Sequence, residues 1–288
     1  MEQSQSTLLR LIGDIPSAIL IPESMKANRQ APLRIVSLAP SATSILCAIG
    51  AKRLLVGVTK WCADIAPVGR LPKLGDCWHM ESVEAILHLK PTLVIGSVPY
   101  KPETVAKLLD QPLNFLAMNP RTLADIENDI RMLGGIAGRA TAAEHLIRKM
   151  RARFDTIRKS SLRTRQPVRV YSEAWPNPRI ASPLWVAEIV KIAGGEMVVP
   201  AGERVSDDQV AEAAPEVIVL AWAATGTKAD PKQTYGVASW KNVPAIRNRQ
   251  VHVIRDELLN TPGPPLVAGA MELAKILRGI NRKPSESG

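Results

Sequence analysis

The sequence has few cysteine and histidine residues and lacks several common catalytic motifs. Its 288 residues include three cysteines and four histidines. Three cysteines cannot all pair with one another, so no disulfide framework is expected. The GxSxG motif of serine hydrolases, the Gly-rich phosphate loop and the HExxH motif of zinc proteases are absent as well. These absences favour a binding protein without a covalently bound cofactor over an enzyme.

Long hydrophobic runs are also missing. No apolar stretch approaches the about 20 residues that a membrane-spanning helix needs, so we expect no membrane insertion. Residues 1–31 lack the basic segment, apolar segment and small-residue cleavage site that together make a secretory signal peptide. The sequence therefore predicts a cytoplasmic protein with an N-terminal extension at residues 1–31. The alternative is a periplasmic protein whose start site has been misassigned.

Negative charge is in short supply, since 37 Lys and Arg residues against 27 Asp and Glu residues give a net charge of +10. The excess is concentrated in one stretch that contains Arg148, Lys149, Arg151, Arg153, Arg158, Lys159, Arg163 and Arg165. Such a stretch could bind nucleic acid or an anionic membrane, or it could be the solvated face of a helix. Aromatic residues do not alternate with these cations as stacking platforms would. The solvated helix is therefore favoured, and no nucleic-acid partner is expected.

What is present is a regular alternation of short apolar segments and helical segments. The segments with strand composition are 33–38, 54–59, 92–97, 113–118, 168–173, 196–200, 216–222 and 249–256. The segments with helical signals are 41–50, 82–90, 102–110, 183–195, 206–214 and a terminal helix. Strands that alternate with helices at these lengths predict right-handed crossovers and parallel sheets.

The second half of this pattern repeats the first. RIVS, which begins at Arg34, matches RVYS, which begins at Arg169. SVEAILHLKPTLVIG likewise matches SDDQVAEAAPEVIVLA further along the chain. Two such units predict an α/β fold with two Rossmann-like lobes, residues 32–138 and residues 166–288.

Residues 139–165 join the two lobes and are predicted to form one long backbone helix. The segment has no Gly or Pro, and its apolar residues fall at helical spacing. A helix of about 20 residues spans about 30 Å, which is long enough to bridge two lobes. A helical connector resists bending more than a Gly/Ser linker does, so lobe closure should be small.

Tryptophan residues cluster where the predicted strands end. Ligands of parallel α/β sheets bind beyond the carboxyl ends of the strands. Trp61, Trp175 and Trp222 follow predicted strands, and Trp78 lies on the same rim. Four of the six tryptophans on one rim indicate a cleft for a large, flat, partly apolar ligand. The other ligand-binding candidates at these strand ends are Pro40, Ser41, Cys62, His79, Tyr100 and Asn260.

Cys62, Cys77 and His79 form a second candidate set near this rim. Thiolates and imidazoles are common ligands of zinc and other transition metals. The spacing of these three residues matches no compact zinc motif, so the prediction is that the protein has no metal site of its own. The alternative is a metal-dependent enzyme or metallochaperone on a chelatase-like two-lobed fold that uses the three side chains.

Two acidic residues, Glu84 and Asp208, occupy equivalent positions in the internal repeat. Each is in the first turn of a predicted helix. Acidic residues there stabilise the helix dipole, by a few tenths to about 1 kcal/mol. The alternative role is a pair of docking points, one in each lobe, for a basic partner surface.

Five segments resemble the iron-siderophore and cobalamin periplasmic-binding family, whose members are the substrate-binding components of ABC importers. They are LRIVSLAPSATSILCAIGA, LLVGVTKWCADIAP, the block from Glu84 through HLKPTLVIG, SDDQVAEAAPEVIVLAW and LLNTPGPPL. The similarity covers residues 33–282 and is nearest to the cobalamin-binding branch. It implies the class III periplasmic-binding-protein fold. It also implies a cobalamin-like or other metal-chelate ligand (corrinoid, siderophore or haem), held for ABC-type uptake or intracellular handling.

The resemblance also implies roles for individual residues. Trp61 and Trp78 match positions where the cobalamin-binding branch has aromatic residues against its ligand. Asp256 lies where that branch has a polar ligand contact. Glu84 and Asp208 match two acidic residues, one in each lobe, that dock onto arginines of the permease. The resemblance thus implies a monomer that binds a small molecule and docks on an ABC permease.

Overall fold

The computed structural model describes residues 32–80, 82–161, 166–225 and 228–280. The chain divides into Met1–Pro32 and one compact unit, Leu33–Gly288. The N-terminal extension predicted at residues 1–31 lies outside the described residues. Within the described ranges, no helix has the length and apolar character needed to cross a membrane.

The first lobe is built on a five-stranded sheet in the order β3-β2-β1-β4-β5. Its strands are β1 (Ile35–Ser37), β2 (Leu55–Thr59), β3 (Lys73–Leu74), β4 (Leu93–Ser97) and β5 (Phe115–Met118). Its helices are α2 (Pro40–Ala48), α3 (Val83–His88), α4 (Pro102–Leu109) and α5 (Leu123–Ile136), with short 3-10 helices η2 (Lys52–Leu54) and η3 (Lys60–Asp64). All four strand pairings are parallel, as the sequence predicts.

The second lobe is built on another five-stranded sheet, in which β6 is central. Its strands are β6 (Val168–Pro176), β7 (Arg179–Ala181), β8 (Gly195–Met197), β9 (Val217–Leu220) and β10 (Val251–Val253). Its helices are α7 (Leu184–Ile192), α8 (Asp207–Glu212), α9 (Pro231–Tyr235), α10 (Pro244–Arg247), α11 (Asp256–Leu259) and α12 (Leu266–Ile280), with 3-10 helix η4 (Ala238–Trp240).

One strand of the second lobe corrects the prediction of an all-parallel sheet. β8, β6, β9 and β10 pair in parallel, but β7 is antiparallel to β6. β6 continues through Pro176, and only two residues separate it from β7. So short a connection can form only a hairpin, and the two strands of a hairpin run in opposite directions.

The strand pairings follow the internal repeat of the sequence. β1 lies between β2 and β4, and the equivalent strand β6 lies between β8 and β9, with every pairing parallel. The helices after the second strands also begin alike, since Ser82 caps α3 and Ser206 caps α8. Ser206 and Gln209 form the capping box that their spacing predicts. The two lobes therefore share a common set of strands and helices, to which the first lobe adds β3 and the second adds β7.

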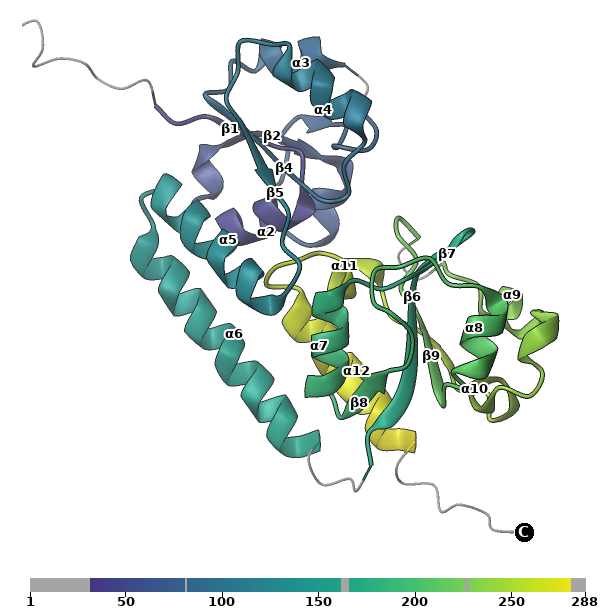
Figure 1. Cartoon of the computed structure of the whole chain (residues 1–288). Coiled ribbons are helices and arrows are strands. Elements are labelled where there is room, and N and C mark those ends of the chain that lie inside the picture. Colours follow the sequence, from purple (N-terminus) through teal and green to yellow (C-terminus); the bar gives the residue numbers. More distant parts are fainter. Residues whose placement is uncertain (1–31, 81, 162–165, 226–227, 281–288) are drawn as a thin grey trace, which may run out of the picture. The chain divides into compact units, whose positions relative to one another are not determined.

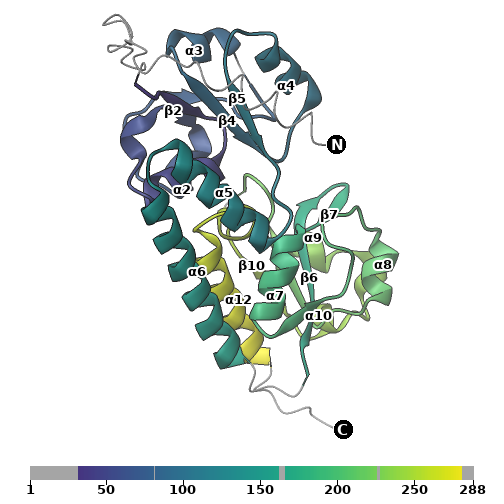
Figure 2. The same cartoon turned by 60° about the vertical axis from the view of Figure 1, so that its left-hand side comes forward.

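The long helix α6 (Ala140–Ser161) occupies the predicted connector. Its buried face includes Ala143, Ile147, Met150, Phe154 and Ile157, at alternating spacings of four and three residues. Figures 1 and 2 both show α6 running beside α5 and α12, and these helices pack against it. Residues 162–165, the end of the predicted connector, lie outside the described residues.

One hydrophobic cluster extends through both lobes. It contains Ile35 from the first sheet, Val170 from the second sheet, Ile147 from α6 and Leu273 from α12. Two smaller clusters cover the other faces of the two sheets. The main cluster contains residues from both sides of the predicted lobe boundaries at residues 138 and 165. The lobes therefore share one core, and the boundaries stay a prediction.

Candidate functional site

The predicted ligand-binding residues lie in the loops that follow the parallel strands of both lobes. In the first lobe, Pro40 begins α2 after β1, and Trp61 and Cys62 are in η3 after β2. Trp78 and His79 follow β3, and Tyr100 follows β4. In the second lobe, Trp175 is in the last part of β6, Trp222 follows β9, and Asp256 and Asn260 begin and cap α11 after β10.

One carboxylate, Asp76, holds both tryptophans of the first lobe. Its Oδ2 accepts a hydrogen bond from Trp61 Nε1 at 3.1 Å. Its Oδ1 accepts the backbone N–H groups of Trp78 and His79 at 2.9 and 2.7 Å. Trp61 is half-buried beneath the ammonium group of Lys60, 4.7 Å from the ring centre, whereas Trp78 is 47 % exposed. The indole of Trp78 is therefore an apolar surface presented to solvent on a loop fixed by hydrogen bonds.

Tyr100 and His79 complete the exposed part of this rim. The hydroxyl group of half-buried Tyr100 donates to the carbonyl oxygen of Met118 at 2.8 Å. Burial raises the pKa of the Tyr100 hydroxyl well above its usual range, so this group stays a neutral donor. His79 is exposed beside Trp78 and is free to contact a ligand.

Ser41 and Cys62 are buried beneath the rim. Cys62 belongs to a chain of hydroxyl and thiol groups, in which Thr59 contacts Cys62 at 3.2 Å and Cys62 donates to Thr43 at 3.1 Å. Thr43 in turn donates to Ser37 at 2.8 Å. These side chains satisfy one another inside the first lobe, and burial raises the pKa of the Cys62 thiol. They support the loops and present no surface to a ligand.

The three candidate metal ligands do not form a metal site. Within the described residues, no group of three or more His, Cys, Asp and Glu side chains could hold a metal ion. Cys77 is buried against Gly96, and burial raises the pKa of its thiol to about 12. Cys62 is bound to hydroxyl groups, while His79 points outward on the rim. The metal-dependent alternative thus loses its structural basis, because the candidate thiols are protonated and buried.

In the second lobe, Trp175 is the exposed aromatic residue among the predicted site residues. Its side chain is 42 % exposed at the end of β6, where a bulge in the β6–β7 pairing occurs. The indole Nε1 donates to the carbonyl oxygen of Asn177 at 2.9 Å, which fixes the ring over the hairpin. Trp175 and Trp78 are therefore comparable, since each lobe presents one exposed indole at its strand ends.

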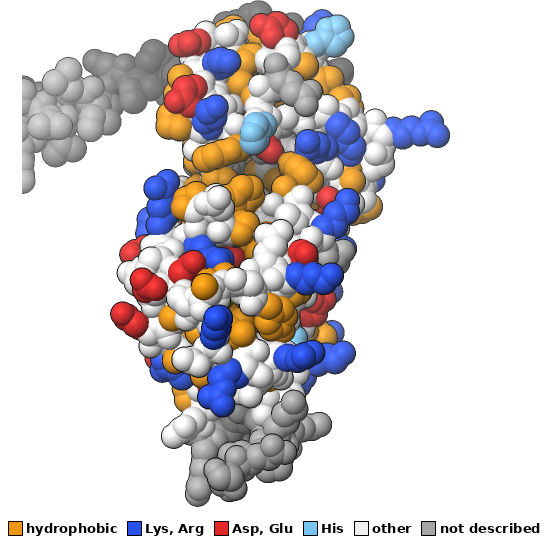
Figure 3. Space-filling model, turned by 90° about the vertical axis from the view of Figure 1, so that its right-hand side faces the viewer, with side chains coloured by type: hydrophobic (Ala, Val, Ile, Leu, Met, Phe, Trp, Pro, Cys, Tyr) orange, Lys and Arg blue, Asp and Glu red, His pale blue; other side chains and the backbone are white. Residues whose placement is uncertain are grey.

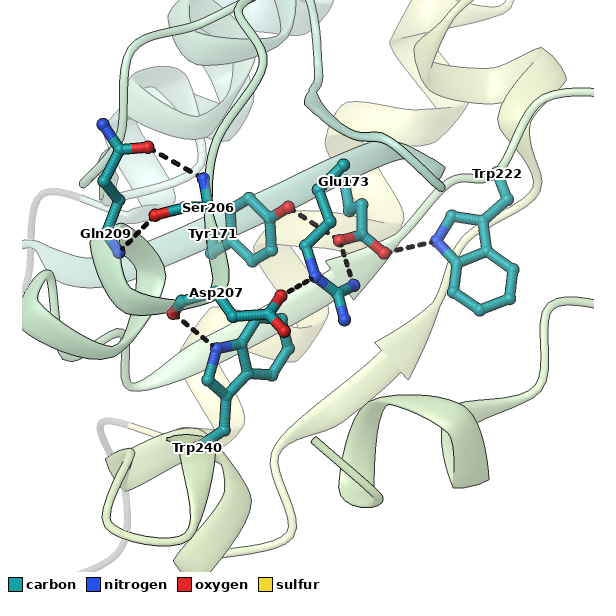
Figure 4. A network of polar contacts seen from close by, with 8 residues as sticks. Tyr171, Glu173, Ser206, Asp207, Gln209, Trp222 and Trp240 are labelled. Carbon is teal, nitrogen blue, oxygen red and sulfur yellow. Dashed lines mark hydrogen bonds and ion pairs between the residues drawn. The ribbon is translucent and has the colours of Figure 1, made fainter. Parts of the chain in front are cut away.

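Trp222 lies beneath this surface and is 5 % exposed. Its Nε1 donates to Glu173 Oε1 at 2.7 Å (Figure 4). Glu173 is fully buried, and its Oε2 accepts from Tyr171 at 2.7 Å and from Arg179 at 2.8 Å. Burial of the Trp222 indole in this network removes it from the surface that a ligand could contact.

Arg179 extends the network to the first turn of α8. Its guanidinium group pairs with both Glu173 and Asp207 and lies 4.4 Å over the ring of Trp240. Trp240 Nε1 donates to the backbone oxygen of Asp207 at 2.8 Å (Figure 4). The strand end of β6 and the beginning of α8 are thereby joined by charged groups.

Asp256 and Asn260 bind neighbouring backbone groups. Asp256 Oδ2 accepts the N–H of Ala224 at 3.1 Å, and Asn260 Nδ2 donates to the carbonyl oxygen of Ala221 at 2.6 Å. Both residues thus hold the loop that follows β9. The Oδ1 atom of Asn260 is buried and has no hydrogen-bond partner among the described residues.

The strand-end loops of the two lobes approach each other. Arg255, after β10, donates to the carbonyl oxygen of Asp64, after β2, at 3.5 Å. Gly263 packs so closely on α2 that a Cβ atom there would lie 3.1 Å from Ser44 Oγ. Figure 3 shows the side of the molecule away from α6, where hydrophobic side chains form a band across the middle of the surface. The loops at the strand ends of the two lobes are therefore in contact at these two points.

Glu84 and Asp208 are both exposed, at the second position of α3 and α8 respectively. The Ser82 hydroxyl donates to Glu84 Oε2 at 2.6 Å, and this hydrogen bond lowers the pKa of the Glu84 carboxyl. Equivalent positions and equal exposure fit both roles predicted for the pair, helix stabilisation and docking.

The sequence gives no direct indication of Asp76, Glu173 or Arg179, although they organise the two rims. Asp76 is the only one of the three with a usable local signal, because an Asp that accepts from the N–H groups two and three residues further on is a common turn former. Glu173 ends a predicted strand and reads as an exposed residue. Its three partners come from three different segments, which no local pattern reveals.

Comparison with known proteins gives a consistent family assignment. The model of a family described as periplasmic binding protein matches residues 35–258. An ABC transporter substrate-binding lipoprotein of Bacillus subtilis, YvrC, is 25 % identical over 86 % of this chain and 80 % of its own. A vitamin B12-binding protein of Vibrio parahaemolyticus is 28 % identical over 87 % of this chain and 91 % of its own. The structure of a periplasmic heme-binding protein from Roseiflexus has a TM-score of 0.74 at 24 % identity, over 88 % of this chain and all of its own.

These similarities confirm the predicted class III fold and the prediction of a substrate-binding protein rather than an enzyme. They overturn the predicted cytoplasmic location. The family is periplasmic and one relative is a lipoprotein, which points to a location outside the cytoplasm. The prediction was wrong because it depended on the composition of residues 1–31 alone.

Proposed function

Because the chain belongs to the periplasmic binding protein family, we propose that it binds a metal chelate of the cobalamin or haem class and delivers it to an ABC importer. The ligand lies between the strand-end loops of the two lobes. The relatives named as vitamin B12-binding and heme-binding proteins indicate this class of ligand. The protein acts as a monomer with one small-molecule ligand and no nucleic-acid partner.

The observation that supports this proposal most is the pair of exposed indoles, Trp78 and Trp175. Large apolar side chains at the surface of a folded protein mark binding sites when they lie in strand-end loops of an α/β fold. The Trp175 ring is fixed by its own hydrogen bond to Asn177, and the backbone of Trp78 is fixed by Asp76. Little ordering entropy of these loops is therefore lost when a flat ligand stacks on the rings. Trp61 and Tyr100 add half-buried aromatic surface beside Trp78.

The polar residues of the rim supply the remaining contacts. His79 is exposed next to Trp78, so its imidazole can hydrogen-bond to the chelate or coordinate its metal. Asp256 and Asn260 lie in the corresponding strand-end loops of the second lobe, at the two ends of α11. Half-buried Pro40 can contact the ligand at the start of α2. Buried Ser41, Cys62 and Trp222 act beneath the rim by fixing the loops and not by touching the ligand.

Binding is tested by titrating the purified protein with cyanocobalamin and, separately, with hemin. Chelate absorbance and tryptophan fluorescence are followed together. Trp78→Ala and Trp175→Ala should each weaken binding of the preferred chelate about tenfold, because each removes one stacking surface. The control is Tyr235→Ala, which removes an exposed ring that is not among the site residues. Absence of binding to both chelates, or equal losses in all three variants, would refute the proposal.

Docking on the permease is assigned to Glu84 and Asp208. Their equivalent, exposed positions place one carboxylate on each lobe, as a two-point contact with a basic surface requires. Glu84→Lys and Asp208→Lys should reduce ligand transport in reconstituted vesicles at least tenfold and leave chelate affinity unchanged. Glu103→Lys, an exposed acid in the first turn of α4, is the matched control. Unimpaired transport in both lysine variants would refute the docking role of these two residues and would leave the proposed ligand class unaffected.

A further inference from the structure

A groove of about 1080 Å³ lies along α6, away from the strand-end loops. It is lined by the first half of α6, by Ala48 at the end of α2 and by the turn that leads into α12. Pro40, at the other end of α2, belongs to the candidate ligand site. The groove is therefore a separate feature at the opposite end of that helix, and neither ligand binding nor the docking acids use it.

The floor of the groove is apolar. It is lined by Leu146 and Met150 from α6, by Pro264 before α12 and by Val267 in the first turn of α12. Met271 is one helical turn beyond Val267 on α12 and is 54 % exposed. Apolar surface thus continues from the groove along α12, next to α6.

The rim of the groove is cationic. Arg139, His145, Arg148, Lys149 and Arg153 line it, and no Asp or Glu does. None of these four Arg and Lys side chains forms an ion pair among the described residues.

Two cations that α6 directs elsewhere are paired. Arg151 pairs with Glu127, and Arg158 pairs with Asp155. Lys159, in the last turn of α6, forms no ion pair among the described residues. The groove is thus where four cations without an ion-pair partner gather around one surface. Unpaired cations around an apolar floor are the complement of a molecule with an anionic head and an apolar tail.

We propose that this groove binds an anionic phospholipid. The lipid phosphate lies between Lys149 and Arg153, which are one helical turn apart on α6, and the upper part of an acyl chain lies on Leu146 and Val267. A free phosphate ion would leave the apolar floor uncovered, and the volume is far larger than such an ion requires. A second copy of this face is disfavoured because two like-charged rims repel each other.

The test uses the full chain and a lipid that stays monomeric in solution. Dihexanoyl phosphatidylglycerol, titrated calorimetrically below its micelle concentration, should bind with a stoichiometry of one. A Lys149→Glu, Arg153→Glu double variant should bind at least tenfold more weakly, since each basic side chain near an anionic lipid contributes substantially. The control is Lys232→Glu, Lys241→Glu, which makes the same change in net charge at exposed sites of the second lobe and should change affinity less than twofold.

Vesicles and competing anions separate this site from diffuse attraction. The protein should float with phosphatidylcholine vesicles that contain phosphatidylglycerol and not with pure phosphatidylcholine vesicles. Inorganic phosphate and a poly-glutamate peptide should compete at least tenfold more weakly than the short-chain lipid. Equal losses in the two double variants, equal binding of inorganic phosphate, or better competition by the acidic peptide would each overturn the assignment. Unfolding midpoints of the variants exclude a folding defect as the cause.

Discussion

Four parallel strands have the same order in the two lobes, β2-β1-β4-β5 and β8-β6-β9-β10, but the polar groups beneath the two rims differ. In the first lobe, neutral side chains form the chain Thr59, Cys62, Thr43 and Ser37. In the second lobe, the equivalent region contains the charged network centred on Glu173 (Figure 4). The repeat therefore specifies topology, while the chemistry that fixes each rim is specific to its lobe. More free energy depends on single residues in the second lobe, because removing one partner of a buried charge costs more than removing a neutral hydrogen bond.

The largest expected effect is that of Glu173→Gln. The substitution removes the buried negative charge opposite Arg179, whose side chain is 16 % exposed. The free energy of unfolding should fall by about 3–5 kcal/mol, the usual cost of breaking a buried pair. Urea denaturation measures it. Glu127→Gln is the control, since Glu127 pairs with the exposed Arg151, and a loss below about 1 kcal/mol is expected there.

Thr43→Val tests the neutral chain of the first lobe. It removes the hydroxyl group that accepts from Cys62 and donates to Ser37, with little change of shape. The free energy of unfolding should fall by about 1–3 kcal/mol, from the partners left unsatisfied. A loss as large as that of Glu173→Gln in the same denaturation experiment would show that the two networks are equally important, and the contrast between the lobes would fail.

Asp129, on α5 of the first lobe, is a half-buried carboxyl group that differs from Glu173 in one respect. Glu173 pairs with Arg179, whereas Asp129 forms no ion pair among the described residues. Burial, and then the nearby charge of Asp125, raise the pKa of its carboxyl to about 6. Because this folded-state pKa lies above the unfolded value of about 3.9, the protonated form is favoured by folding. Stability should therefore fall as the pH rises from about 4 through 6.

Asp129→Asn should remove that dependence on pH. At pH 8 the variant should be more stable than the parent by about 1 kcal/mol, a figure reduced from the full shift because the side chain is half-exposed. At pH 4 the two should be equal. Thermal unfolding across this range measures the difference, and a variant less stable than the parent at pH 8 would contradict the assignment.

The smallest expected effect compares the two equivalent helix caps. Ser206→Ala breaks a complete capping box at α8, whereas Ser82→Ala removes a single cap hydrogen bond at α3. Losses of about 1 kcal/mol and about 0.5 kcal/mol are expected. Equal losses in the two variants would mean that the reciprocal bond from Gln209 adds nothing.

Periodicity and repeats in the sequence predict most of the fold. The internal match predicts that β1 and β6 are equivalent, and the absence of Gly and Pro predicts α6. The helix α5 is missed, although Thr122 and Asp125 form a capping box at its beginning. β7 is missed because its direction depends on a two-residue connection and not on composition.

The candidate site is less predictable than the fold. Strand ends identify where Trp78 and Trp222 lie in the chain, but not that one indole is exposed and the other buried. That difference is set by Glu173, whose carboxylate binds Trp222 from another strand. Tertiary hydrogen bonds of this kind leave no periodic signal in a single sequence.

The continuous hydrophobic cluster has a consequence for the kinetics of ligand binding. Swinging the lobes apart would expose side chains of α6 and α12, at about 0.8 kcal/mol for each buried methylene group. The loops that bear Trp78 and Trp175 are therefore brought into position when the chain folds, and their ordering entropy is lost then and not on association. The binding surface is therefore already formed before the ligand arrives. Ligands of similar size should then have similar association rate constants and differ mainly in their dissociation rate constants.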